Sequence, residues 1–149
     1  MLAVCSVACN DDVLPEGDNG DNGGNGDNGG STTVVTFAVE ISEVSPIGAK
    51  VSAVPSDNTT TYFFNVVSKE ELARYADAKT YAKKLIASIK EYYDFYEGNF
   101  TLNLSAGADG YQFDENMIAP DTEYYAFAFG VTTDGTITTE VTLVPFKTL

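Results

Sequence analysis

Apolar residues alternate strictly with small or polar ones from Val35 to Ser42. A period of two is typical of a half-buried β-strand. The same alternation returns at residues 49–54 and 61–67, and turn-forming residues at 45–46 and 55–58 separate the three runs. Three strands joined by two short turns predict an antiparallel β-sandwich. In the third run, one face is expected to carry Tyr62, Phe64 and Val66.

The pattern changes from strand to helix at Ser68. Ser68 and Glu71 have the spacing of a capping box, in which a hydroxyl at the N-cap is followed three residues later by a glutamate. This pair predicts a short helix that begins after Ser68 and runs to about residue 76.

A second helix is predicted from Asp77, which can act as its N-cap, to about Glu97, where Gly98-Asn99 closes it. Apolar residues three and four positions apart form one stripe along this helix: Tyr81, Leu85, Ile89, Tyr92 and Tyr96. We expect the stripe to pack a helical insertion, at about 69–97, onto the sandwich.

The tyrosines of the insertion allow a second interpretation, a platform on which sugar rings stack. This set comprises Tyr75, Tyr81, Tyr92, Tyr93 and Tyr96. Tyr93 lies off the centre of the stripe, so it is the better candidate for exposure to solvent. Tyr93 and Tyr75, together with Thr133 and Asp134 of a predicted turn, form the candidate binding surface.

Strand patterns return after the helices. Phe100, Leu102 and Leu104 alternate with polar residues, and further strands are expected at 111–113 and 124–130. A tight turn at Thr133-Asp134-Gly135 leads into a last alternating run from Ile137 to Leu143, which predicts the closing strand.

One segment carries a resemblance to a known family. Ile118, Pro120, Thr122 and Tyr124 resemble the fibronectin type III signature L-x-P-x-T-x-Y. The resemblance implies a mainly β fold over residues 33–149: a fibronectin type III or Ig-like antiparallel sandwich with an α-helical insertion after the third strand. It also makes Tyr124 a structural tyrosine corner, whose hydroxyl ties the preceding loop to the sheet. The chain departs from the family in lacking a strand-B tryptophan and in carrying the helices.

The N-terminal segment resembles the end of a bacterial lipoprotein signal peptide. Residues 1–8 are apolar and end in small side chains before Cys9, which would carry the lipid, and an acidic pair follows as in Bacteroidetes surface lipoproteins. The run is short and has no basic residue, so we expect the natural start to lie upstream. The alternative is a disordered tail with two chance cysteines.

Residues 9–32 are predicted to be a flexible tether, because the stretch Gly17–Gly30 contains only glycine, asparagine and aspartate. Its repeated carboxylate and amide oxygens could suggest calcium binding. The stretch lacks the late bidentate glutamate of a calcium loop, so the tether is the preferred interpretation.

Composition excludes several function classes. A net charge of -14 disfavours nucleic-acid and anionic-lipid partners. The chain has no histidine, which removes histidine-based nucleophile systems and most catalytic zinc sites. An enzyme would depend on carboxylates such as Asp109, Asp114 and Glu115, but these lie in or beside a turn, where they are common. We therefore predict no enzyme, no cofactor and no metal.

Charge is distributed unevenly along the chain. The insertion at 69–97 is neutral and holds six of the eight basic residues, so the sandwich and tether account for the whole negative charge. The insertion is thus the only region where an anionic partner could dock, although a solvated face is the simpler interpretation.

Together these features predict a non-catalytic interaction module, anchored by an N-terminal lipid in the outer membrane and displayed at the cell surface. Its partner would be an unidentified protein or glycan, with membrane contact through the acyl anchor only. The alternative is a structural or assembly subunit of a larger envelope or fimbrial complex. In that case an edge strand, Phe100–Leu104 or Val34–Glu43, would pair with another chain. A third possibility is an inhibitor or stabiliser of a neighbouring secreted enzyme.

Overall fold

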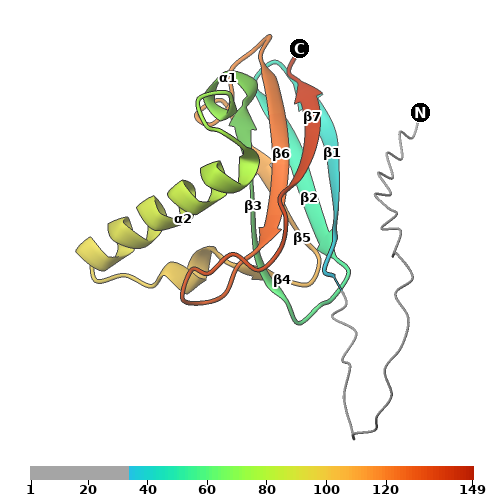
Figure 1. Cartoon of the computed structure of the whole chain (residues 1–149). Coiled ribbons are helices and arrows are strands. Elements are labelled where there is room, and N and C mark those ends of the chain that lie inside the picture. The colour runs from blue at the N-terminus through green and yellow to red at the C-terminus, as the bar shows by residue number, and fades with distance from the viewer. Residues whose placement is uncertain (1–33) are drawn as a thin grey trace, which may run out of the picture. The chain divides into compact units, whose positions relative to one another are not determined.

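The computed structural model of the chain describes residues 34–149, which form two antiparallel β-sheets and a helical segment (Figure 1). The smaller sheet has the strand order β1-β2-β5, with β1 at Phe37–Ser45, β2 at Gly48–Pro55 and β5 at Asp109–Phe113. The larger sheet has the order β4-β3-β6-β7, with β3 at Thr61–Ser68, β4 at Ser105–Ala106, β6 at Glu123–Gly130 and β7 at Thr142–Lys147. The prediction of a mainly β fold built from antiparallel sheets is confirmed.

The two sheets pack face to face, and the alternation along β2 shows why. Ala49, Val51 and Ala53 are fully buried, whereas Lys50 between them is exposed. The buried side of β2 meets the larger sheet, where Ala126 and other residues of β3 and β6 close one continuous core. The apolar half of each alternating strand therefore lies between the sheets.

Tyr62 joins the two sheets by a polar contact inside this core. Its hydroxyl lies 3.0 Å from the carbonyl oxygen of Ala53 on β2 and 2.8 Å from that of Gly107. Burial, with a smaller contribution from the negative charge of Asp109, raises the pKa of Tyr62 to about 12. As predicted, Tyr62, Phe64 and Val66 share the face of β3 that looks toward the smaller sheet.

The opposite face of the larger sheet is apolar too. Phe63, Phe127 and Phe129 are buried there, and they form a second core with Ala82 and Ile86 of the long helix. The larger sheet is thus covered on both faces, by the smaller sheet on one side and by the helical segment on the other. This arrangement explains why β3 and β6 read as nearly continuous apolar runs.

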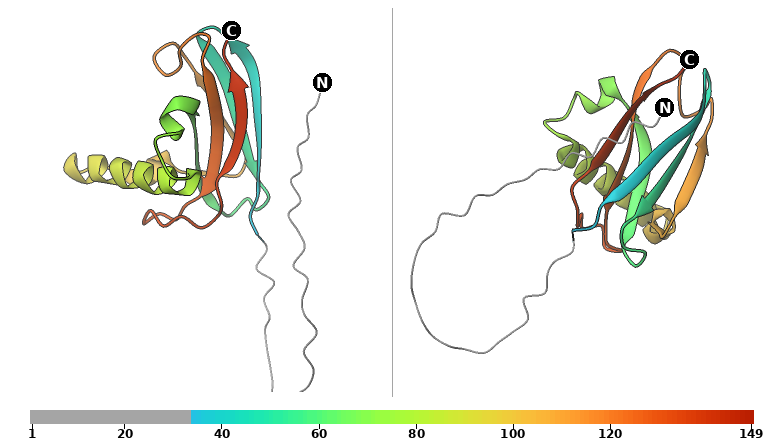
Figure 2. Two further views of the ribbon diagram at one scale, coloured as in Figure 1. Left: turned by 45° about the horizontal axis from the view of Figure 1, so that its top comes forward. Right: turned by 90° about the vertical axis from the view of Figure 1, so that its right-hand side faces the viewer.

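The helical segment contains α1 at Lys69–Leu72 and α2 at Ala78–Phe95. Both predicted N-caps are confirmed: the Ser68 hydroxyl accepts a hydrogen bond from the Glu71 N–H at 3.1 Å, and Asp77 accepts one from the Thr80 N–H at 2.7 Å. The first helix is shorter than predicted and ends at Leu72. Figure 2 shows that α2 lies on one side of the larger sheet, away from the smaller one.

Helix α2 ends at a different residue from the one predicted. Glu97, not Gly98, takes the left-handed conformation, with φ of 52°. The Gly98 N–H then donates to the Tyr93 carbonyl at 2.8 Å, and the Glu97 N–H donates to the Asp94 carbonyl at 3.4 Å, as in a Schellman motif. Gly98 is needed for a different reason, because a Cβ there would lie 2.6 Å from Cδ1 of the Tyr93 ring.

Two predicted strands are wrong or displaced. Phe100–Leu104 is not a strand: the 3₁₀ helix η1 occupies Phe100–Asn103, because the Asn99 side-chain oxygen accepts the Thr101 N–H at 3.0 Å and starts a turn. The closing strand begins at Thr142 rather than at Ile137. The Thr139 hydroxyl accepts a hydrogen bond from the Gly130 N–H at 2.8 Å, in place of the backbone carbonyl that would accept it in a regular strand pair.

Tyr124 makes the contact that a tyrosine corner requires. Its hydroxyl accepts a hydrogen bond from the Ala119 N–H at 2.7 Å, in the loop that precedes β6. Its buried ring stacks on Phe146 with a centroid distance of 5.6 Å. The buried Thr148 hydroxyl holds the same loop by donating to the Ala119 carbonyl at 2.7 Å.

Candidate interaction surface

The two halves of α2 have different surroundings. In the first half, Ala82 and Ile86 are buried, and Tyr81 packs edge-on against Phe127 of β6 with a centroid distance of 5.7 Å. The second half projects away from the sheets (Figures 1 and 2). The fully buried side chains of the helix thus lie in its N-terminal half, and in its C-terminal half Ile89 and Tyr93 keep one face against the core while the other face is exposed.

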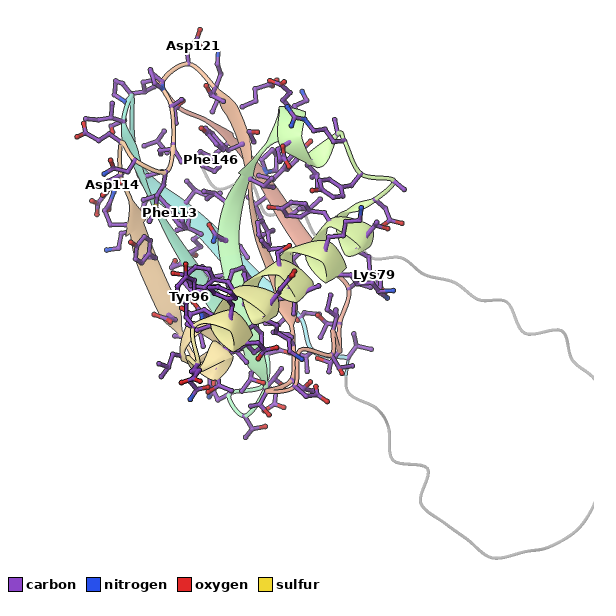
Figure 3. All side chains as sticks on the ribbon, turned by 90° about the vertical axis from the view of Figure 1, so that its left-hand side faces the viewer. Lys79, Tyr96, Phe113, Asp114, Asp121 and Phe146 are labelled. Atoms are coloured by element: carbon purple, nitrogen blue, oxygen red, sulfur yellow. The ribbon has the colours of Figure 1, made fainter. Side chains whose placement is uncertain are left out.

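Three aromatic side chains are exposed at the projecting end. Tyr92 is 58%, Phe95 78% and Tyr96 64% exposed. Their rings form a connected group, with centroid distances of 4.7 Å between Tyr92 and Tyr96 and 4.9 Å between Phe95 and Tyr96. Figure 3 shows Tyr96 within this group, on the side of the molecule that α2 covers.

Two hollows connect these rings with the sheet. One, of about 350 Å³, is lined by Tyr92 and Tyr93 of α2 together with Asn65 and Asn103. A neighbouring one, of about 330 Å³, shares Asn65 and Asn103. The second is flanked by further exposed apolar side chains: Leu102, Tyr111 and Met117. We call the six exposed residues the aromatic surface: Tyr92, Phe95, Tyr96, Leu102, Tyr111 and Met117.

Tyr93 and Tyr75 are less exposed than the sequence suggests. Tyr93 is half-buried on the core side of α2, with its hydroxyl 3.4 Å from Oδ1 of Asn103. Tyr75 is also half-buried and packs edge-on against Tyr81 with a centroid distance of 5.1 Å. Both contribute to packing, so the exposed aromatic residues are neighbours of the predicted ones.

The predicted stripe along α2 has the wrong phase in its second half. The face that packs on the sheet passes through Ala82, Ile86, Ile89 and Tyr93, with Tyr81 and Leu85 beside it. Tyr92 and Tyr96 lie off this face. Ala82 is fully buried, and its small side chain allows close approach of α2 to the sheet. Residues 82, 86, 89 and 93 also have helical spacing, so the sequence offers two apolar stripes and the contacts with the sheet select this one.

The predicted turn residues Thr133 and Asp134 belong to a loop that is fastened to α2. The Lys90 ammonium group donates a hydrogen bond to the Asp134 carbonyl. The Asp134 carboxylate accepts bonds from the Thr132 hydroxyl and from the Thr136 N–H, and these bonds lower its pKa. The polar groups of Asp134 are therefore already engaged within the loop. This places Thr133 and Asp134 beside α2, away from the exposed rings.

Three of the six basic residues of the insertion face acidic partners. Lys69 lies 3.0 Å from Glu123, Lys79 lies 2.8 Å from Glu140, and Arg74 lies 3.1 Å from Glu71. Contact with Glu123 raises the pKa of Lys69. Lys83, Lys84 and Lys90 form no salt bridge within residues 34–149; Lys84 lies over the Tyr75 ring, and Lys90 donates to a backbone carbonyl.

Acidic residues surround the exposed end of α2. Glu91, Asp94 and Glu97 are exposed, and the last turn of the helix carries no basic residue. Within residues 34–149, none of the three takes part in a salt bridge. The last turns of α2 therefore carry three exposed acidic side chains that form no salt bridge within the described residues.

The carboxylates considered for catalysis serve local turns. Asp109 accepts a hydrogen bond from the Ser105 hydroxyl at 2.5 Å, and Asp114 accepts one from the Asn116 N–H at 2.9 Å. Glu115, next to Asp114, is exposed. In the described part of the chain, no group of three or more Cys, Asp or Glu side chains is placed to hold a metal ion.

The predicted lipid site, Cys9, lies outside the described residues, as does the predicted tether. Over residues 34–149, no helix has the length and hydropathy needed to cross a bilayer. Comparison with protein-family models, curated proteins and solved structures finds no match to this chain.

Proposed function

We propose that this chain is a non-catalytic interaction module with a fibronectin type III-like fold, held at the surface of a Gram-negative cell by a lipid on Cys9. The strand orders β1-β2-β5 and β4-β3-β6-β7 support the proposed fold, as does the bond between Tyr124 and Ala119. The resemblance of residues 1–9 to a lipoprotein signal supports the anchor.

The observation that carries the proposal is the exposed end of α2. Helix α2 packs on the sheet as far as Tyr93 on one face, while its last turns present Tyr92, Phe95 and Tyr96 to solvent on the other. Connected apolar side chains on a protein surface mark interaction sites more often than scattered ones do, and tyrosine is enriched where proteins meet partners.

The test is a binding screen with the full chain in which both cysteines are replaced by serine. It is offered to a glycan array and to cell-envelope extracts. We expect a partner that is retained by the parent protein and lost in Phe95→Ser/Tyr96→Ser. The matched control is Ile47→Ser/Val54→Ser, which removes two apolar side chains that are 51% and 45% exposed on the smaller sheet. Equal retention by both double variants would refute the proposal.

The anchor is tested separately in cells of a lipoprotein-producing Gram-negative bacterium. The chain, fused behind a complete lipoprotein signal peptide that retains residues 6–9, is expected to incorporate radiolabelled palmitate and to move to the membrane fraction, and Cys9→Ser should abolish both. Label in the Cys9→Ser variant would refute attachment at that residue.

A second candidate function, assembly into a larger complex, is favoured by strand β1. It is an edge of the smaller sheet and spans nine residues, Phe37–Ser45. The edge strand β7 carries Pro145 and Lys147, which discourage pairing, whereas β1 has no proline. The other predicted edge, Phe100–Leu104, cannot pair because η1 occupies it. Size-exclusion chromatography of the full chain distinguishes the two: concentration-dependent oligomers that Ile41→Pro abolishes would favour assembly.

A further inference from the structure

The C-terminal end of α2 carries negative side chains, which the helix dipole disfavours at that end. The carbonyl end of a helix is the negative pole of its dipole, where lysine or arginine is favourable and acids are not. Here Glu91 and Asp94 lie three residues apart in the last turns of the helix, and Glu97 follows at the residue that closes it. We call these three side chains the acidic ridge. The three like charges repel one another as well as the dipole.

Glu97 adds a second conflict at the same place. It occupies the left-handed position that closes the helix, with φ of 52°, where glycine would be free of strain. Local choices that oppose the fold, gathered in one turn, are expected at functional positions. Because these acids oppose the stability of the helix, a role in binding explains the acidic ridge better than a role in folding.

The exposed rings share the last turns of α2 with these acids: Phe95 lies one helical turn from Glu91, and Tyr96 precedes Glu97. Tyr92 and Tyr96 are one turn apart and in contact, and Phe95 stands nearly perpendicular to Tyr96, at 82°. Several aromatic faces are thus open in different directions. An aromatic face attracts a cation, and the attraction from the adjacent carboxylates acts in the same direction.

The nearest basic side chain does not neutralise the ridge through a salt bridge. Lys83 and Lys90 line the same hollow as Glu91 and Asp94 but form no salt bridge with them, and the Lys90 ammonium group donates to the Asp134 carbonyl. The ridge and the rings thus present negative charge and π-electrons to solvent together.

We propose that the end of α2 binds a cationic segment of a protein, with arginine or lysine side chains stacked on Tyr92, Phe95 and Tyr96 and paired with Glu91, Asp94 and Glu97. This inference rests on the proposed function and specifies its partner class. Charge complementarity selects this occupant, because a neutral glycan gains nothing from the ridge and an anionic partner is repelled by it.

The test uses the ¹⁵N-labelled full chain with both cysteines replaced by serine. The probe is a blocked octapeptide of alternating arginine and glycine, and its glutamate counterpart is the control. We expect saturable amide shifts confined to residues 91–103 with the arginine peptide and none with the glutamate peptide. Shifts spread over the acidic sheets would overturn the inference, since they would indicate attraction to the net charge alone.

Three variants separate local recognition from general attraction. Phe95→Ala/Tyr96→Ala keeps every charge and should weaken peptide binding by about two- to five-fold per lost ring contact. Glu91→Gln/Asp94→Asn should weaken it too, whereas Glu40→Gln/Glu43→Gln, with the same change in net charge on strand β1, should not. Equal weakening by the two charge variants, or no effect of the aromatic variant, would overturn the inference.

Failure of this inference and failure of the proposed function give different results. If the arginine peptide does not bind but a glycan or envelope protein is lost in Phe95→Ser/Tyr96→Ser, the cationic partner is refuted and the interaction module stands. If neither binds, both proposals fail.

Discussion

Replacing Tyr124 with phenylalanine tests the contact on which the proposed family resemblance depends. The substitution removes only the hydroxyl, which accepts a hydrogen bond from the Ala119 N–H at 2.7 Å. The ring stays in place, because it stacks on Phe146 and is 8% exposed. The loop before β6 keeps its second tie, the Thr148 hydroxyl, so we expect loss of stability without loss of the fold.

The expected magnitude follows from the kind of bond that is lost. One intramolecular hydrogen bond contributes about 1 kcal/mol to the free energy of unfolding. Ala119 is exposed, so water can satisfy its N–H in the variant, and no large desolvation penalty is added. For a folded region of this size, about 1 kcal/mol corresponds to a decrease in Tm of about 3–5 °C.

The assay is urea unfolding and thermal unfolding, both followed by circular dichroism, with Tyr125→Phe as the matched control. Tyr125 lies next to Tyr124 and is half-buried, and its hydroxyl makes no hydrogen bond with the described part of the chain. Its substitution should change the free energy of unfolding by less than about 0.5 kcal/mol. Equal stability of Tyr124→Phe and wild type, or equal losses in the two variants, would refute the reasoning.

Three further predictions concern α2. Ile86→Ala, at a side chain that is 2% exposed, should lower the free energy of unfolding by about 3 kcal/mol in urea; a smaller loss confined to helical signal would mean that α2 frays separately from the sheets. Glu97→Gly should raise Tm, because it relieves a left-handed conformation that costs about 1 kcal/mol. Gly98→Ala should lower Tm, because the added Cβ would press on the Tyr93 ring. A lower Tm for Glu97→Gly and a higher one for Gly98→Ala would contradict the assigned helix end. Burial, with the nearby Glu71, raises the pKa of Tyr81 to about 12. The protonated hydroxyl therefore favours folding, and this contribution to stability is lost as pH rises from about 10 to 12. Urea unfolding should show a decrease in the free energy of unfolding over that range that is smaller in Tyr81→Phe, and an equal decrease in the variant would refute the assignment.

The sequence was informative where local chemistry decides the structure. Period-two alternation located β1, β2 and β3, and the caps at Ser68 and Asp77 located both helix starts, because each signal is contained in a few adjacent residues. Segments governed by side-chain hydrogen bonds were missed. Asn99 turns an alternating run into η1, and Thr139 delays β7, and neither effect changes the hydrophobic pattern.

The candidate surface could be predicted only in outline. The sequence predicts exposure of Tyr93 and packing of Tyr92 and Tyr96, whereas the exposure of each tyrosine depends on the phase of α2 against the sheet. That phase is decided by contacts far apart in sequence, such as Ile86 and Phe100 in the same core as Phe127. The acidic ridge was visible in the sequence, yet its meaning depends on knowing that the neighbouring rings face solvent.

The division of α2 into a packed half and a projecting half separates two selective pressures. Changes at positions 82 and 86 alter the second core and therefore the folding of the whole sheet assembly, whereas changes at 92, 95 and 96 leave that core untouched. If the proposed binding by this turn holds, substitutions at 92, 95 and 96 should change what is bound without repacking the second core. For the same reason, an engineer can graft a new specificity onto that turn without redesigning the scaffold.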